Sequence, residues 1–133
     1  MLKEKQIKKK LNEIRQQKRE ISAMLDNAED EEYDRLETLS DELEEVDTQL
    51  YWLIKAVSES AQPKNEWFIN FCQSIPNGKY LSEKQWDCFV KYAKCSVGRY
   101  EYSYSAIING VQYHTIGRKL YQSKLPEVWK QFA

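Results

Sequence analysis

The sequence predicts a mainly α protein of the α+β class, with an N-terminal antiparallel coiled-coil helical hairpin followed by a small helical domain that contains one β-hairpin. Two heptad seams in the first half of the 133-residue chain predict the coiled coil. An Asn-Gly pair between two β-prone runs predicts the β-hairpin. Aromatic residues concentrate after Gln62, which marks the second domain. We expect the coiled-coil hairpin over residues 1–58, a linker over 59–63 and the second domain over 64–133.

The coiled coil is predicted from apolar residues that recur at alternating steps of four and three. The first seam comprises Ile7, Leu11, Ile14, Ile21 and Leu25. Lys18 stands at its one interrupted place. The two seams differ in phase, so either one long helix carries a stutter or the chain turns between them. The second seam is uninterrupted and comprises Leu36, Leu39, Leu43, Val46, Leu50, Leu53 and Val57.

We favour a turn near Asp26 to Asp30, because this polar segment offers Asn27 or Asp30 as the cap of a second helix. The charge pattern points the same way. Residues 1–19 carry eight Lys or Arg against two Asp or Glu, whereas residues 20–62 carry fourteen acids against two bases. A basic helix folded back on an acidic one places unlike charges beside the seam, while the leucines supply most of the stability.

The second domain is predicted to contain helices before its β-hairpin. Residues 65–72 have helical spacing, and a turn follows at 75–78. Ser82 to Gln85 fits a capping box that opens a helix ending before Gly98, with Trp86 and Phe89 on its apolar face. A short closing helix is expected after Pro126.

The β-hairpin is predicted over residues 100–108 and 111–116, around Asn109-Gly110. This turn pairs Ile108 with Val111, Ala106 with Tyr113 and Tyr104 with Thr115. Because side chains alternate along a strand, four tyrosines fall on one face of the hairpin. These are Tyr100, Tyr102, Tyr104 and Tyr113.

Two interpretations of the tyrosine face stay open. Aromatic rings beside cations form a platform on which nucleic-acid bases stack while the cations contact phosphate. Alternatively, the face is buried against Trp67 and Trp86, because a two-stranded hairpin needs a cover. The candidate binding residues are these tyrosines together with basic residues of the second domain: Lys84, Lys91, Lys94, Arg99, Tyr100, Tyr102, Tyr104, Tyr113, Arg118, Lys119 and Lys124.

The charge of residues 63–133, ten bases against five acids, favours nucleic acid or an acidic protein surface as the partner. We therefore expect a non-enzymatic binding module whose second domain engages nucleic acid, with the coiled coil as spacer or dimerisation arm. The alternative is an adaptor or inhibitor directed at a host protein, such as a phage anti-defence factor, since an acidic helix imitates a line of phosphates. A homodimer also stays open, because Tyr51, Trp52 and Ile54 add an apolar stripe beside the second seam.

Few residues support enzymatic chemistry. His114 is the only histidine, and the chain has no nucleophile elbow, phosphate-cradling loop or metal-binding motif. Cys72, Cys88 and Cys95 match neither a disulfide scaffold nor zinc-ligand spacing. No apolar run is long enough to cross a bilayer and no secretory signal begins the chain. We expect a cytoplasmic protein without cofactor, metal or small-molecule substrate.

One short motif suggests an origin. Leu81-Ser82-Glu83-Lys84-Gln85-Trp86 resembles the helix start of assorted small bacteriophage and mobile-element proteins, many of them associated with replication. The resemblance is confined to the residues around that helix. It implies a phage-type origin and assigns no site.

Overall fold

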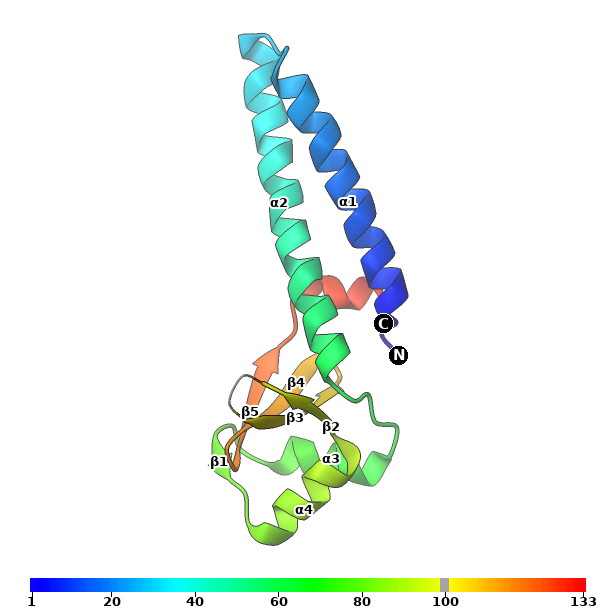
Figure 1. Cartoon of the computed structure of the whole chain (residues 1–133), viewed down its shortest axis with the longest axis vertical. Coiled ribbons are helices and arrows are strands. Elements are labelled where there is room, and N and C mark those ends of the chain that lie inside the picture. The colour runs from blue at the N-terminus through cyan, green and yellow to red at the C-terminus, as the bar shows by residue number, and fades with distance from the viewer. Residues whose placement is uncertain (99–100) are drawn as a thin grey trace. The chain divides into compact units, whose positions relative to one another are not determined.

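The structure, a computed structural model, describes residues 1–98 and 101–133 and confirms an α+β chain that begins with a helical hairpin. The single β-hairpin is wrong, because the second half holds a five-stranded antiparallel sheet (Figure 1). The elements are α1 (Glu4–Leu25), α2 (Asp30–Glu59), α3 (Glu66–Ser74), β1 (Lys79–Tyr80), α4 (Glu83–Tyr92), β2 (Lys94–Val97), β3 (Tyr102–Ile108), β4 (Val111–Ile116), β5 (Lys119–Lys124) and the 3-10 helix η1 (Glu127–Gln131).

The chain divides into two compact units. The hairpin unit comprises Lys3–Ile54 and Pro126–Phe132, so the closing segment, which is a 3-10 helix, groups with the helical hairpin. The sheet unit comprises Met1–Leu2, Lys55–Leu125 and Ala133. None of the helices in the described ranges is long and apolar enough to cross a membrane.

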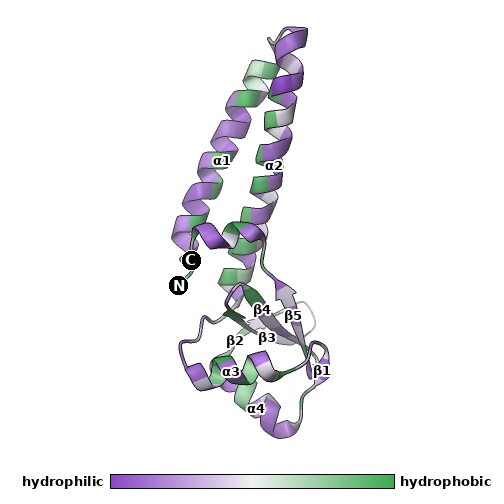
Figure 2. Cartoon of the chain, turned by 180° about the vertical axis from the view of Figure 1, so that it is seen from behind, coloured by the Kyte–Doolittle hydropathy of each residue, from purple (hydrophilic) through white to green (hydrophobic). Residues whose placement is uncertain are grey.

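The hairpin unit reverses direction where the sequence predicts a turn. α1 ends at Leu25 and α2 begins at Asp30. Hydrophobic residues recur along both helices among hydrophilic ones (Figure 2). The buried seam residues of this unit are Ile7, Leu11, Ile14, Leu36, Leu50 and Leu53. Packing of these two apolar stripes holds the helices together.

An acid on α2 explains the interruption of the first seam at Lys18. The Lys18 Nζ lies 3.1 Å from the Asp47 Oδ2, and the Arg15 Nε donates to the same oxygen over 3.2 Å. Lys18 also pairs with Glu44. Asp47 is only 8% exposed, whereas Leu39 of the predicted seam is 40% exposed. Asp47 of α2 therefore meets α1, and its buried carboxylate, paired with the partly exposed Arg15 and Lys18, favours one register of the two helices.

The predicted ion pairing between the basic helix α1 and the acidic helix α2 occurs over a short stretch of the two helices. Within residues 1–98 and 101–133, the ion pairs that join α1 to α2 come from Arg15 and Lys18. Lys8 and Lys10 pair instead with Glu4 and Glu13 of their own helix. Such exposed pairs within a helix contribute little to stability.

The sheet unit has the strand order β1-β5-β4-β3-β2 (Figure 1). Helices α3 and α4 lie together against one face of the sheet, and the core forms between these layers. Phe68, Cys72 and Phe89 come from the helices, and Ile75 and Leu81 from the connections around β1. The sheet contributes Ala106, Ile108, Tyr113 and Leu120.

The Asn-Gly turn joins β3 and β4 as predicted. Both turn residues have positive φ, 48° at Asn109 and 77° at Gly110, which matches a type I′ turn. The predicted pairs of Ile108 with Val111 and of Ala106 with Tyr113 are confirmed. The ladder ends one pair before Tyr104 and Thr115, where the Tyr104 N–H instead donates to the Thr115 hydroxyl over 3.0 Å.

The predicted capping box also forms. The Ser82 hydroxyl accepts from the Gln85 N–H, and the Gln85 side chain accepts from the Ser82 N–H. The helix ends at Tyr92, before Gly98 as predicted. Residues 94–97 are strand β2, which pairs with β3.

Candidate functional site

The tyrosine face of β3 and β4 is the face that meets the helices, but its residues differ in burial. Tyr113 is 4% exposed and belongs to the core, which agrees with the second interpretation of this face and leaves its ring unavailable to a base. Tyr104 is half-buried and Tyr102 is 65% exposed. The face is thus core at the Asn109-Gly110 end and surface at the other end of β3.

The exposed end of this face forms what we call the aromatic patch, defined as Trp86, Cys95, Val97, Tyr102, Tyr104 and Arg118. Strand pairing brings most of it together: Val97 lies opposite Tyr102, and Cys95 opposite Tyr104. Opposed residues of antiparallel strands point to the same side of the sheet. Val97 and Cys95 are both exposed, so this part of the sheet is open to solvent.

Trp86 and Arg118 complete the aromatic patch from α4 and from the turn between β4 and β5. The Trp86 ring meets the Tyr104 ring edge to face, with centroids 5.5 Å apart at 80°. The Arg118 guanidinium lies over the Trp86 ring, 5.5 Å from its centroid. Backbone contacts support this placement, because the Leu81 N–H at the start of α4 donates to the Arg118 carbonyl. A planar cation is therefore held over the tryptophan of a Trp-Tyr ring pair.

The hydroxyl of Tyr104 takes part in the same cluster. A side-chain hydrogen bond with Cys95 is the main cause that raises the pKa of Tyr104. A tyrosine is uncharged at physiological pH even with its ordinary pKa, so the ring does not repel an anion. Asp87 and Glu101, which adjoin Trp86 and Tyr102 in the sequence, carry exposed carboxylates.

Among the predicted basic residues that the structure describes, Lys94, Lys119 and Lys124 lie away from the aromatic patch. Lys94 donates from its Nζ to the Ser58 carbonyl over 2.7 Å, and alternation along β2 puts it on the opposite face from Cys95. Lys119 faces away from Leu120 and the core. Lys124 lies at the far end of β5, paired with Val111. Lys84 is exposed in the first turn of α4, and the Lys91 Nζ sits 5.5 Å above the Tyr92 ring.

Two members of the predicted set, Arg99 and Tyr100, fall outside the described residues. Of the others, the structure brings Tyr102, Tyr104 and Arg118 into one cluster. Trp86, which sequence reasoning treated only as a cover for the tyrosines, is the ring that links them. The sequence signal for its role was its place on the apolar face of the predicted helix, which was expected to cover the tyrosines.

Trp67 lies elsewhere than the sequence suggests. It does not cover the tyrosine face, since it is 60% exposed and stacks on Phe71 with centroids 5.6 Å apart. Phe68, one position along α3, is the ring that enters the core. Trp67 and Phe71 therefore form a second, separate aromatic surface on α3.

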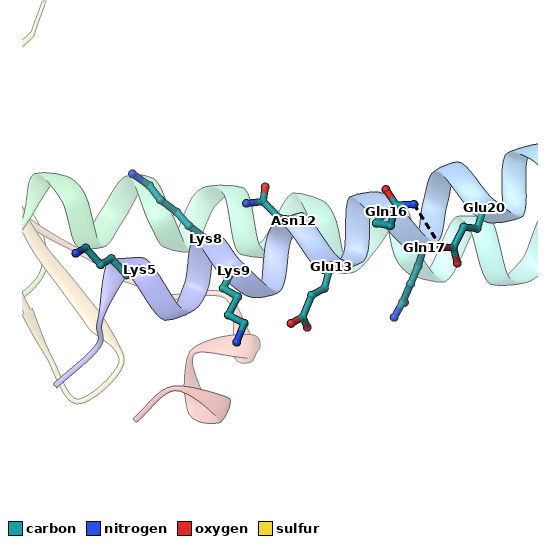
Figure 3. A pocket seen from close by; sticks show the side chains of 8 residues that line it. All are labelled: Lys5, Lys8, Lys9, Asn12, Glu13, Gln16, Gln17 and Glu20. Carbon is teal, nitrogen blue, oxygen red and sulfur yellow. Dashed lines mark hydrogen bonds between the residues drawn. The ribbon is translucent and has the colours of Figure 1, made fainter.

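A shallow hollow on the hairpin unit follows the outer side of α1 (Figure 3). Polar side chains of this single helix line it, and the Gln16 side chain donates to Glu20 over 3.3 Å. A surface lined by one helix lacks the facing walls that enclose a small ligand. The lining residues are Lys5, Lys8, Lys9, Asn12, Glu13, Gln16, Gln17 and Glu20.

The remaining reactive groups form no site of their own. Burial raises the pKa of the Cys72 thiol to about 12 and also raises that of Cys88. Both thiols therefore stay protonated and poorly nucleophilic. His114 stacks on Tyr121 with ring centroids 6.0 Å apart, on the other face of the sheet from Tyr113. In the part of the chain that the structure describes, no three His, Cys, Asp or Glu side chains are placed to hold a metal ion.

No protein-family model, curated protein or solved structure matches this chain.

Proposed function

We propose that this chain is a non-enzymatic nucleic-acid-binding module and that the aromatic patch is its contact surface. The observation that carries the proposal is the combination of an exposed Tyr102 ring, a Trp86–Tyr104 ring pair and the Arg118 guanidinium at one open end of the sheet. Bases stack on aromatic rings, and a guanidinium donates paired hydrogen bonds to phosphate.

The exposure of these side chains supports the proposal. Tyr102 and Val97 leave large apolar groups in water on a unit whose core already contains several aromatic rings. Contiguous exposed apolar surface with a polar rim is typical of interaction sites. Arg118 adds a positive charge, which favours binding of an anionic ligand over a purely apolar one.

The proposal predicts that Arg118→Ala weakens binding of labelled oligonucleotides by about tenfold at low salt, because it removes a phosphate contact and the cation above Trp86. Fluorescence anisotropy across a salt series measures this. Lys124→Ala is the matched control, since it removes the same charge at the far end of β5. It should change the Kd by less than about twofold.

Two outcomes would count against the proposal. Equal effects of Arg118→Ala and Lys124→Ala would move the contact surface away from the aromatic patch. No measurable binding of single- or double-stranded oligonucleotides at low salt would remove nucleic acid as the ligand altogether.

A second candidate function is favoured by the surface of α2. Its exposed acids include six that make no ion pair within the described ranges: Glu31, Glu32, Asp34, Glu37, Asp41 and Glu42. A helix with such a row of carboxylates resembles a phosphate backbone in charge. The chain would then be an adaptor or inhibitor directed at a nucleic-acid-binding host protein, and affinity capture with α2 charge variants would test this.

A further inference from the structure

We propose that the ligand of the aromatic patch is a single strand with unpaired bases, whether DNA or RNA, and not a duplex. This inference rests on the proposed function and narrows it. Three features of the aromatic patch support it: the spacing of its rings, their exposure and the charge around them.

The spacing of the two tyrosines excludes an intact base stack. Tyr102 and Tyr104 lie two residues apart on β3 and on the same face, so their positions are separated by about 6.6 Å. Successive bases of a duplex strand are only about 3.4 Å apart. Two neighbouring bases that each stack on a tyrosine must therefore separate from one another, which a paired helix resists and a flexible single strand allows.

The exposed ring surface fits the same ligand. The faces of bases inside a duplex are covered by neighbouring base pairs, so rings such as Tyr102 have nothing to stack on there. In a single strand each base offers a free face. The aromatic patch lies on a sheet, where side chains from adjacent strands stand side by side, as in other base-stacking platforms built on sheets.

The charge distribution disfavours a duplex ligand. A duplex is bound chiefly through many phosphate contacts, and about six to ten of them make binding strongly salt-dependent. Within the described residues, Arg118 contributes a cation to the patch, while Lys94 and Lys124 lie elsewhere. Stacking must therefore supply much of the affinity.

The test compares four probes of about ten nucleotides, within the usual site size of single-strand binding surfaces: oligodeoxythymidine, oligouridine, a mixed-sequence duplex and an abasic strand. The single strands should bind at least about tenfold more tightly than the duplex or the abasic strand, because stacking contributes on this scale per base. The abasic strand keeps the phosphates and removes only the bases.

Substitutions of single tyrosines test which ring stacks on the bases. Tyr102→Ala should weaken single-strand binding by about tenfold, and Tyr102→Phe should restore it, since the ring and not the hydroxyl stacks. Tyr80→Ala is the matched control, because Tyr80 is 64% exposed, nearly as much as Tyr102, but points to the opposite face of the sheet. Circular dichroism confirms that each variant is folded.

The outcomes separate this inference from the proposed function. Duplex binding as tight as single-strand binding, or an abasic strand that binds as well as oligodeoxythymidine, would overturn the single-strand inference and leave nucleic-acid binding in place. Failure of all four probes to bind would overturn both. A preference between oligouridine and oligodeoxythymidine would identify RNA or DNA as the source of the strand.

Discussion

Replacing Phe89 with alanine is expected to destabilise the sheet unit by about 4 kcal/mol, the largest effect predicted for a single substitution in this chain. Phe89 is fully buried on α4 and its ring lies 5.8 Å from that of Phe68 on α3. Its removal would leave a cavity between the helices and the sheet that the packed neighbours cannot fill. Chemical denaturation followed by near-ultraviolet circular dichroism measures the loss.

Trp67→Ala is the control for Phe89→Ala. Trp67 is a larger aromatic residue on the same helical layer, but it is mostly exposed and its ring contacts Phe71 only at the surface. Its loss should cost less than about 1 kcal/mol. A Trp67→Ala variant as unstable as Phe89→Ala would mean that the helices cover the sheet by a different face.

Replacing Asp47 with alanine is expected to destabilise the hairpin unit by about 2 to 3 kcal/mol. Removing one member of a fully buried ion pair costs about 3 to 5 kcal/mol, and the figure is lower here because Arg15 and Lys18 reach solvent. Denaturation followed at the helical circular dichroism band gives the change. Glu45→Ala removes an exposed acid from the same helix and should change stability by less than about 0.5 kcal/mol.

The same carboxylate makes the hairpin unit sensitive to acid. Burial alone would raise the pKa of Asp47, but Arg15 and Lys18 outweigh it and hold the pKa below its ordinary value of 3.8. The resulting stability is present above that value and is lost as pH falls through the lower, folded-state pKa. The wild type should therefore lose more stability between pH 6 and pH 2 than Asp47→Asn, a comparison that cancels the contribution of the other acids. Equal losses would contradict this pairing of Asp47.

The heptad seams predicted the helical hairpin because their signal is local and repeated. The lysine at seam position 18 could not be explained from the first helix alone. It occupies that position because it pairs with Asp47 on the second helix. Asp47 is buried beside the predicted seam position Val46, whereas the predicted seam residue Leu39, two turns away, is exposed.

The sheet was underpredicted because three of its strands have weak local signals. β1 is two residues long, and β5 has polar residues on both faces around Leu120. β5 depends on the turn at Gly117, whose φ of 60° suits a tight hairpin, and this turn signal was missed. β2 continues directly from a helix with a strong apolar face, so its strand character appears only through pairing with β3.

The missed strands also limited prediction of the candidate site. The alternation of β3 correctly gathered Tyr102 and Tyr104 on one face, but only the cover provided by α3 and α4 separates these tyrosines from the buried Tyr113. Without β5, Arg118, Lys119 and Lys124 seemed equivalent. Their places along β5 and its preceding turn put only Arg118 beside Trp86.

The most direct test of the central claim is a nuclear magnetic resonance titration of the whole chain with oligodeoxythymidine, following backbone amides and the indole N–H groups. Binding at the aromatic patch predicts that shifts concentrate at Trp86, Cys95 to Val97, Tyr102 to Tyr104 and Arg118, with α1 and α2 little changed. Shifts confined to the lysines of α1, or resonances that do not move at all, would contradict it.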